Sequence, residues 1–400
     1  MAVYRASRRS ARCVTLTEPS IGADTGTSHA VRGSWTNNSQ RSPPGNIADG
    51  SCETGLVNRW FIVWLAVFAL AARAVAGQAL LYSLSTGDPT PSPRIVKTEI
   101  FAVDPQTGNR RVVFSDAGLD WILLPAYPGG GERQTMVTSG GKVFARGLPR
   151  NSYRGGWPTY PAALYELKID GSNQGRKIFD IEGNLETGSN FRNLFSDPMG
   201  SRIGYLTYQN GKPYLYLRET NRGDLLRRMD LSRITLDCLV TNIGFLPDGK
   251  QMFFTLDTGD DDSTSKASFG RVGRYVIKTD GSPPVRTARI SNLVAPLSGS
   301  RDLYQGRFPS SFLYVTDAAE KTRRDYATTA TGVPDFFRVS ADARMVAFLE
   351  EQRVYTPTAT ISLVIRWVDL GSGLEQSLPP VSTKPVVLPW VNLIGWFPAD

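Results

Sequence analysis

The sequence predicts an all-β protein, a six-bladed β-propeller whose ring is closed by the C-terminal strand joining the N-terminal blade. Three observations indicate this fold. A strand–turn–strand motif recurs six times, a second hairpin follows each copy, and one copy is divided between the two ends of the repeating region. Units that recur in this way are typical of propellers and other repeat architectures, so the repeat is the strongest fold signal in the chain.

The first motif is an apolar strand, a tight turn and a second apolar strand. Its clearest copy, IGFLPDGKQMFFT, spans Ile243–Thr255. The Pro-Asp-Gly sequence favours a turn because Asp bonds nearby backbone and Gly accepts positive φ. Successive turns are separated by 44 to 64 residues. The six turns lie at Gly77, Gly141, Gly200, Gly249, Gly299 and Ala343.

A second hairpin follows each turn. Each one has an alternating apolar run and a short turn region before its second strand, usually with an acidic residue or glycine there, as expected of antiparallel hairpins. Two hairpins per unit make a four-stranded sheet, and six such sheets packed face to face around an axis bury their apolar faces. The hairpins span Glu99–Phe114, Ala163–Phe179, Tyr214–Met229, Arg274–Ile290, Phe312–Ala327 and Leu363–Leu378.

The divided repeat predicts how the ring closes. The chain ends in IGWFPAD, Ile394–Asp400, which is the first half of the motif, and the missing half is GQALLYS, Gly77–Ser83. The first blade therefore takes its innermost strand from Val391–Trp396 and its other three strands from the N-terminal side. A five-bladed count would leave Leu297–Arg324 unassigned, although this segment aligns with the other repeats.

The turn and hairpin pattern resembles the WD40-like (PD40) β-propeller repeats of the TolB family, whose units run strand, S-P-D-G, strand and a short strand ending D-G. Residues 243–281 match this pattern well, and residues 195–230 and 335–378 also match it. The resemblance covers residues 77–400 and implies the fold, but such propellers serve many functions. TolB carries an α/β domain before its propeller, whereas residues 1–76 show no βα pattern, so the Tol role is not implied.

The N-terminal residues carry features of export. An apolar run of 13 residues, Trp60–Ala72, follows Arg59 and precedes Ala74–Ala76, which has the small-x-small character of a cleavage site. We therefore expect a signal peptide at 57–76, preceded at 1–56 by a disordered or mis-called extension, and a periplasmic or secreted protein of a Gram-negative bacterium. A retained membrane anchor stays open because Arg73 lies close to the cleavage point.

Composition excludes several classes of function. The formal net charge of +8 includes an excess of four in residues 1–76, and the remainder is too mild to predict a nucleic-acid partner. The single histidine, His29, precedes the propeller, which excludes histidine-based catalysis and histidine-ligated metal there. Cys238 is the one cysteine after residue 76, and no P-loop or dinucleotide motif occurs, so we expect no disulfide and no cofactor. Catalysis by carboxylates alone stays open.

Loop lengths suggest a binding face. In a propeller the connections between the second and third strands, and between blades, share one face, and the long connections all belong to this set. They are Gly87–Val96, Asp116–Arg133, Gly147–Ala162, Leu256–Arg271 and Glu350–Thr360. Aromatic residues and arginine are typical interface anchors, and two neighbouring loops contain several. The candidate ligand-binding residues are Trp121, Tyr127, Arg150, Tyr153, Arg154, Trp157 and Tyr160. Trp121 and Trp157 could alternatively pack beneath their own loops.

One of these loops is acidic. It contains Asp257, Asp260, Asp261 and Asp262, and oxygen ligands of this kind suit Ca²⁺. Their spacing does not match a known calcium loop, so a solvated acidic turn is the favoured interpretation and we expect no metal.

These observations favour a non-enzymatic, exported propeller that binds a protein partner or a cell-envelope component through the long-loop face. The alternative is a carbohydrate-active enzyme or lectin that uses carboxylates on the propeller. A third hypothesis is a scaffold within a larger assembly. The sequence predicts neither the ligand nor the oligomeric state.

Overall fold

The computed structural model describes residues 77–88, 94–124, 134–150, 153–154, 157–158, 162–182, 190–235, 238–257, 270–288, 293–297, 301–306, 313–317, 322–326, 333–354, 360–381 and 390–398. The predicted extension at 1–56 and signal peptide at 57–76 lie outside these residues and stay predictions. In the part of the chain that is described, no helix is long and apolar enough to cross a membrane.

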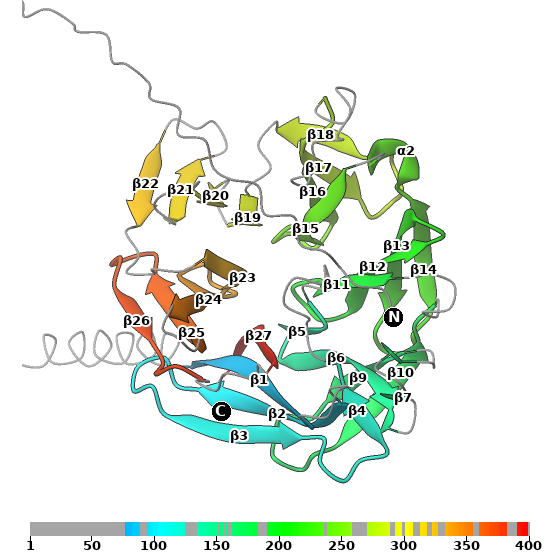
Figure 1. The fold of residues 1–400 in the computed structure, drawn as a ribbon. Helices are drawn as coiled ribbons and strands as arrows, with labels where there is room; N and C mark the ends of the chain where they lie inside the picture. Colours follow the sequence, from blue (N-terminus) through cyan, green and yellow to red (C-terminus); the bar gives the residue numbers. More distant parts are fainter. Residues whose placement is uncertain are drawn as a thin grey trace, which may run out of the picture. The chain divides into compact units, whose positions relative to one another are not determined.

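The described residues form six antiparallel sheets arranged as the blades of a propeller, which confirms the predicted fold class (Figure 1). From the innermost strand outward, blade 1 contains β27 (Trp390–Pro398), β1 (Gln78–Asp88), β2 (Arg94–Val103) and β3 (Arg110–Ser115). Blade 2 contains β4 (Trp121–Leu123) and β5 (Met136–Ser139), then β6 (Lys142–Pro149), β9 (Ala163–Leu167) and β10 (Gly175–Asp180). Blade 3 contains β11 (Asn190–Ser196), β12 (Arg202–Gln209), β13 (Lys212–Glu219) and β14 (Leu225–Asp230).

The other three blades repeat the same order of strands. Blade 4 contains β15 (Leu239–Phe245), β16 (Gln251–Asp257), β17 (Gly273–Lys278) and β18 (Val285–Ala288), and the short helix α2 (Ser232–Thr235) precedes it. Blade 5 contains β19 (Leu293–Pro296), β20 (Arg301–Gln305), β21 (Leu313–Asp317) and β22 (Arg323–Tyr326). Blade 6 contains β23 (Val333–Val339), β24 (Met345–Val354), β25 (Thr360–Asp369) and β26 (Glu375–Ser377). A separate two-stranded ribbon pairs β7 (Tyr153–Arg154) with β8 (Trp157–Pro158).

The two ends of the repeating region join within blade 1, as the divided repeat predicted. β27 runs antiparallel to β1 from Gln78↔Pro398 to Ser85↔Trp390, with one irregularity at Leu81/Tyr82. β27 also lies beside β23 of blade 6 and β5 of blade 2, so it links blade 1 to both neighbours. The closing strand is therefore held by main-chain hydrogen bonds on one edge and by side-chain packing on both sides.

The predicted connection Asp116–Arg133 between blades 1 and 2 is wrong in its bounds. The segment contains β4, an apolar strand that pairs with β6 at Trp121↔Pro149, while β5 pairs with the earlier part of the same strand. The main chain of Arg146 bridges the two, since Leu124 N donates to Arg146 O and Arg146 N donates to Thr135 O. Blade 2 thus carries an insertion between 124 and 135 within its innermost strand, because Trp-Ile-Leu is apolar enough to pair and be buried.

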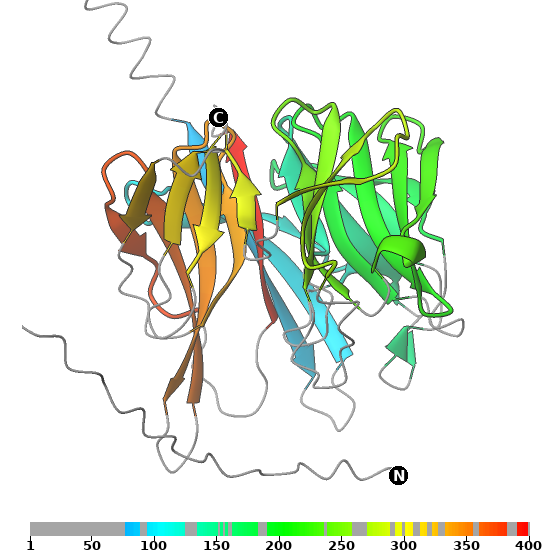
Figure 2. The same ribbon diagram turned by 90° about the horizontal axis from the view of Figure 1, so that it is seen from above.

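Two further predicted connections are shorter than expected, because the strands on both sides continue. β1 and β2 pair as far as Asp88↔Arg94, so little of Gly87–Val96 is a connection. β24 and β25 pair as far as Val354↔Thr360, so little of Glu350–Thr360 is one. These hairpins extend beyond the neighbouring blades on the face seen at the bottom of Figure 2.

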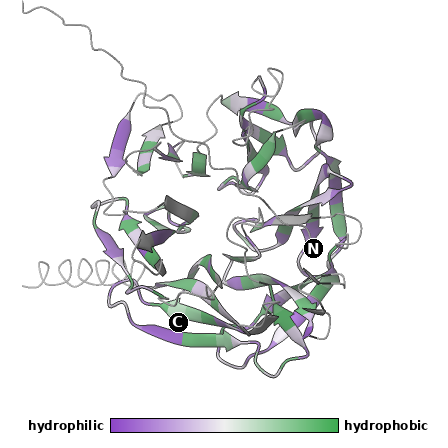
Figure 3. Cartoon of the chain, in the orientation of Figure 1, coloured by the Kyte–Doolittle hydropathy of each residue, from purple (hydrophilic) through white to green (hydrophobic). Residues whose placement is uncertain are grey.

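The core lies between the faces of neighbouring blades. One cluster joins Leu206 and Leu215 of blade 3 to Ile243 and Phe254 of blade 4, and equivalent clusters lie at other blade pairs. The inner strands are mainly apolar, whereas an outermost strand such as β22 is hydrophilic (Figure 3). Each blade therefore contributes apolar faces to two seams and a polar edge to the outside.

Candidate functional site

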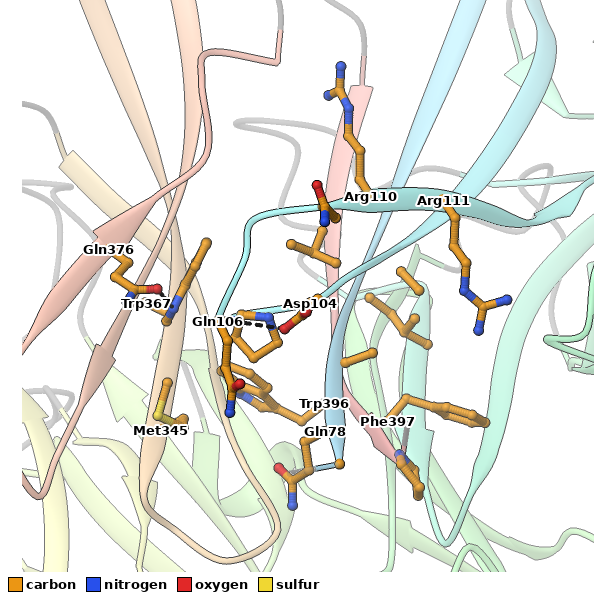
Figure 4. Close-up of a pocket in the computed structure, with 18 of the residues that line it drawn as sticks. Gln78, Asp104, Gln106, Arg110, Arg111, Met345, Trp367, Gln376, Trp396 and Phe397 are labelled. Atoms are coloured by element: carbon orange, nitrogen blue, oxygen red, sulfur yellow. Dashed lines mark hydrogen bonds between the residues drawn. The ribbon is translucent and has the colours of Figure 1, made fainter. Parts of the chain in front are cut away.

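A cavity of about 550 Å³ opens at the seam where blade 6 meets blade 1 (Figure 4). It lies on the face that carries the turns between first and second strands and between third and fourth strands, opposite the end at which β1 meets β2 (Figure 2). Its walls come from the ends of β27 and β1, from the turn between β2 and β3, and from both turns of blade 6. We call it the seam pocket. Its lining includes Gln78, Asp104, Gln106, Met345, Trp367, Gln376 and Trp396.

Two tryptophans form much of the floor of the seam pocket. Trp396, 8% exposed, donates its indole N–H to Arg338 O of blade 6 at 3.0 Å, which fixes the end of β27 against that blade. Trp367 on β25 donates its indole N–H to Gln376 Oε1 on β26 at 3.1 Å. Both indole N–H groups are therefore used within the protein, and the rings offer apolar surface to the pocket.

Three carboxylates line the pocket, and each accepts hydrogen bonds from its own turn. Asp104 accepts from Gln106 N and Thr107 Oγ1, both at 2.8 Å. Hydrogen bonds from the Gln106 backbone and the Thr107 hydroxyl lower the pKa of the Asp104 carboxyl. Asp342 accepts from Ser340 Oγ at 2.6 Å. These groups shape the turns because Asp binds backbone N–H groups two residues on.

Asp369 serves the same purpose in the turn between β25 and β26. It accepts from Gly371 N at 2.7 Å and from Ser372 N at 2.8 Å. Burial raises the pKa of the Asp369 carboxyl, but the hydrogen bonds from Ser372 and Gly371 outweigh that effect and hold it below its usual range. At neutral pH the pocket therefore contains ionised carboxylates.

Three guanidinium groups also line the pocket. Arg110 and Arg111 lie on β3 of blade 1, and Arg344 lies on blade 6. Arg110 donates to Tyr82 Oη at 3.4 Å. Figure 4 shows the side chains of Arg110 and Arg111 on the opposite side of Asp104 from Trp367 and Gln376. On the blade 6 side, the aromatic and amide groups of Trp367 and Gln376 line the pocket together with Arg344 and the carboxylates of that blade.

The pocket exists because this seam is built differently from others in the ring. In the other seams whose residues are described, the outermost strand of one blade contacts the outer turn of the next blade, which is the turn between its third and fourth strands. In seam 1–2, Gly171 N donates to Val113 O at 3.0 Å. In seam 2–3, Arg176 donates to Asn221 O at 3.1 Å. In seam 5–6, Arg324 donates to Gly371 O at 2.8 Å.

The register of the outermost strands explains the difference. Counting from the turn between third and fourth strands, the same position pairs Arg176 with Glu166, Arg324 with Val315 and Gln376 with Trp367. Glutamine thus stands in blade 6 where other blades have a longer, cationic side chain. The Gln376 amide accepts from Trp367 in its own blade, and the space toward the turn of blade 1 is the pocket.

The candidate residues Trp121 and Arg150 support their own region of the fold. Trp121 is 8% exposed in β4 and stacks on Tyr165, with ring centroids 4.1 Å apart. Arg150 donates to Leu119 O at 2.7 Å and to Asp116 O at 2.5 Å. Trp121 is therefore part of the core of blade 2, and Arg150 holds the 116–119 turn.

Three other candidates lie together on the two-stranded ribbon. Tyr153 pairs with Pro158, and Arg154 pairs directly with Trp157, so the main chain brings these residues into one short hairpin. The ribbon lies on the long-loop side in Figure 2. Tyr127 and Tyr160 are outside the described residues. The ribbon residues stay a predicted binding surface.

The acidic loop after β16 is described only at its first residue. Asp257 ends β16 and pairs with Leu239, whereas 258–269, which includes Asp260, Asp261 and Asp262, lies outside the described residues. Where side chains are described, no group of three or more His, Cys, Asp or Glu residues could hold a metal ion. The weak metal-site hypothesis is untested at its main residues.

Sequence reasoning missed the seam pocket because it weighed loop length, and the pocket lies among short turns. A signal was present. Basic residues begin or lie within the outermost strand of five repeats, whereas the sixth reads Glu375-Gln376-Ser377. Comparing the repeats at that position would have indicated an atypical seam beside the predicted ring closure.

No protein-family model and no curated protein matches the sequence. Solved structures with similar folds include TolB from Acinetobacter baumannii, at 13% identity and a TM-score of 0.47, covering 79% of this chain and 66% of that chain. Another is the nidogen/laminin complex, at 12% identity and a TM-score of 0.46, covering 81% and 99%. A puromycin hydrolase gives 13% identity and 0.42, covering 76% and 46%.

The similarity to TolB expected from the repeat motif thus extends to the structures, at the level of the fold. The chain spans just under two thirds of the TolB chain. Scores below 0.5 at such low identity carry no function from these proteins, so the site must be interpreted from its own residues.

Proposed function

We propose that this protein is an exported β-propeller that binds a protein partner of the cell envelope, and that the seam pocket is its binding site. The observation that carries the proposal is the pocket itself. It combines aromatic and polar lining groups, and it lies where the described residues lack the outer arginine contact seen in seams 2–3 and 5–6. Aromatic side chains beside arginine and amide groups are typical of the energetic centre of protein interfaces. Export rests on the signal-peptide pattern at 57–76.

The carboxylates of the pocket support binding over hydrolysis. A glycoside hydrolase needs one carboxylic acid that keeps its proton at working pH, which requires a raised pKa. Asp104 and Asp369 have lowered pKa values, because turn hydrogen bonds stabilise their ionised forms. The carbohydrate-active alternative would therefore need other carboxylates.

The long-loop ribbon is the second surface through which such a partner could bind. It carries the predicted anchors Tyr153, Arg154 and Trp157 on one short hairpin. Because it lies on the opposite face from the seam pocket, variants of the two surfaces separate the two placements of the site.

The test is affinity capture from a cell-envelope extract. The bait is the protein expressed from the full chain and purified in the form that the expressing cells produce. Leu374 is 60% exposed at the pocket rim, so Leu374→Lys should fold, obstruct the pocket and repel a cationic ligand. Leu226, 53% exposed on β14, provides the matched control Leu226→Lys. A third variant replaces Tyr153, Arg154 and Trp157 with alanine.

We expect one specific protein to be retained by the wild type and by Leu226→Lys, and lost with Leu374→Lys. Loss only with the triple variant would move the site to the ribbon and keep the function. Retention of no component would contradict the protein-binding proposal. Retention of polysaccharide would contradict it as well and would favour the carbohydrate alternative.

A further inference from the structure

We propose that the seam pocket receives an arginine side chain of the partner protein, which completes the seam between blades 6 and 1 in the way that intrinsic arginines complete other seams. This inference rests on the proposed function, since it names the chemistry by which the protein partner would be recognised. It is argued from the repeat itself, because the same local geometry occurs elsewhere in the ring with its arginine present.

The first step concerns what arginine does in the other seams. Arg176 of blade 2 donates to Asn221 O in the outer turn of blade 3, and Arg324 of blade 5 donates to Gly371 O in the outer turn of blade 6. In seam 3–4 the guanidinium of Arg227 lies so close to Gly281 that a Cβ there would be 1.6 Å from Nη2. A guanidinium against the outer turn of the next blade is therefore a recurring contact.

The second step identifies the acceptor in blade 1. Each of three outer turns is closed by the same hydrogen bond, from Gly223 N to Glu219 O, from Gly373 N to Asp369 O and from Gly108 N to Asp104 O. In the first two turns, the carbonyl that accepts from the arginine belongs to the residue two positions after Glu219 or Asp369. These acceptor residues are Asn221 and Gly371. The equivalent carbonyl in blade 1 is that of Gln106, whose residue lines the seam pocket.

The third step concerns the donor. The position that supplies Arg176 and Arg324 is Gln376 in blade 6, as the strand register shows. Glutamine is shorter than arginine, and its Oε1 already accepts from Trp367 Nε1. The turn of blade 1 thus faces a cavity where the repeat elsewhere places a guanidinium.

The fourth step is the chemistry around that position. Asp104 and Asp369 are held in their ionised forms, and each belongs to a turn that lines the pocket. The lining guanidinium groups of Arg110 and Arg111 lie on the far side of Asp104 from Gln376 (Figure 4), whereas Arg344 lies on the blade 6 wall. Arg324 lies over the ring of Tyr326 at 5.1 Å in its own seam, and here Trp396 and Trp367, which are 8% and 2% exposed, line the pocket.

Arginine fits this arrangement better than lysine. Its planar guanidinium has five donors and can bond a carbonyl and a carboxylate together while stacking on an aromatic ring. An ammonium group is compact and strongly hydrated, so it would lose more hydration for fewer directed contacts. The inference therefore predicts selectivity for arginine over lysine, and over neutral citrulline, which has nearly the same shape.

The experiment is a titration of the full chain, labelled with ¹⁵N at tryptophan, with N-acetyl-Gly-Arg-Gly-amide. The lysine and citrulline peptides of the same length are the controls. Indole N–H signals of Trp367 and Trp396, assigned with phenylalanine variants, report on the pocket floor. We expect saturable shifts of these two signals with the arginine peptide, and at least tenfold weaker binding of the citrulline peptide.

The decisive variant is Gln376→Arg, which would supply the missing guanidinium from blade 6 itself. It should reduce binding of the arginine peptide at least tenfold while leaving the urea midpoint at or above that of the wild type. Arg324→Gln, in seam 5–6, should leave binding at the pocket unchanged. Equal binding of arginine and citrulline peptides by the wild type would overturn the inference without any variant.

The outcomes also separate this inference from the proposed function. If the envelope protein is captured through the pocket but an excess of the arginine peptide does not displace it, the function stands and the arginine inference is wrong. If the peptide binds but no protein is captured, the proposed function fails while the pocket keeps its selectivity.

Discussion

Ring closure through Trp396 allows a quantitative test of how the two ends of the propeller are joined. The indole is 8% exposed, lies in the core cluster with Tyr82 and Leu393, and bonds Arg338 O across the blade 6–1 seam at 3.0 Å. Replacing a buried tryptophan with alanine costs about 3–5 kcal/mol. Leaving the Arg338 carbonyl without this donor adds about 1 kcal/mol. We therefore expect Trp396→Ala to lower the free energy of unfolding by about 4–6 kcal/mol.

The assay is urea unfolding of the full chain, monitored by circular dichroism. Free energies of unfolding are compared between variants whose m-values equal that of the wild type. Trp396→Phe isolates the hydrogen bond, because it keeps an aromatic ring and removes the N–H. Trp121→Phe is the matched control, since Trp121 is equally buried but stacks on Tyr165 within blade 2. Trp396→Phe should lower the free energy of unfolding by about 1 kcal/mol more than Trp121→Phe does. If Trp396→Ala changed the unfolding free energy by less than about 1 kcal/mol, closure by β27 would not stabilise the ring as described.

Three further predictions test other parts of the molecule. Asp116, fully buried, accepts from Thr98 N and Leu123 N at 2.8 and 2.9 Å, so Asp116→Asn, which can accept only one of them, should cost about 1–3 kcal/mol in urea unfolding. Burial raises the pKa of Asp116, so the native state keeps its proton to higher pH than the unfolded chain. Wild-type stability should therefore fall relative to Asp116→Asn as pH rises from about 4 through that pKa, and a pH-independent difference would contradict this. Arg324→Gln should lower the free energy of unfolding by about 1 kcal/mol or less, because the side chain is exposed. Gly395→Ala should lower the melting temperature measurably, since Gly395 has φ of 144° and a Cβ would lie 2.7 Å from Thr138 Cγ2; an unchanged melting temperature would refute the strain.

The fold could be predicted from the sequence because the repeat states the same strand order several times. The Pro-Asp-Gly turn of Ile243–Thr255 and the divided copy at the chain ends were sufficient to assign six blades and the closing strand. Individual strands were harder. The short β4 has three residues, and its pairing with β6 depends on the insertion between 124 and 135, which no local pattern in the sequence indicates.

The candidate site was harder to predict for a physical reason. Loop length and aromatic content selected Trp121, yet this residue begins the buried strand β4, and its indole packs on Tyr165. The seam pocket depends on a missing side chain at Gln376, and a missing contact is visible only by comparison with its equivalents. Repeat proteins provide that comparison within one chain, because Arg176 and Arg324 show what the position usually does.

The seam that closes the ring is also the one where an outer contact can be omitted at low cost. Near the axis, Arg338 Nε donates to Ile394 O at 3.2 Å and receives the Trp396 indole N–H on its own carbonyl, so β23 and β27 hold the two blades together. The outer contact through position 376 is then not needed for closure. Restoring this outer contact by Gln376→Arg should stabilise the propeller and remove the proposed arginine binding. This trade-off between stability and binding is expected if the seam pocket serves the function proposed for it. A protein selected for stability alone would have arginine at this position.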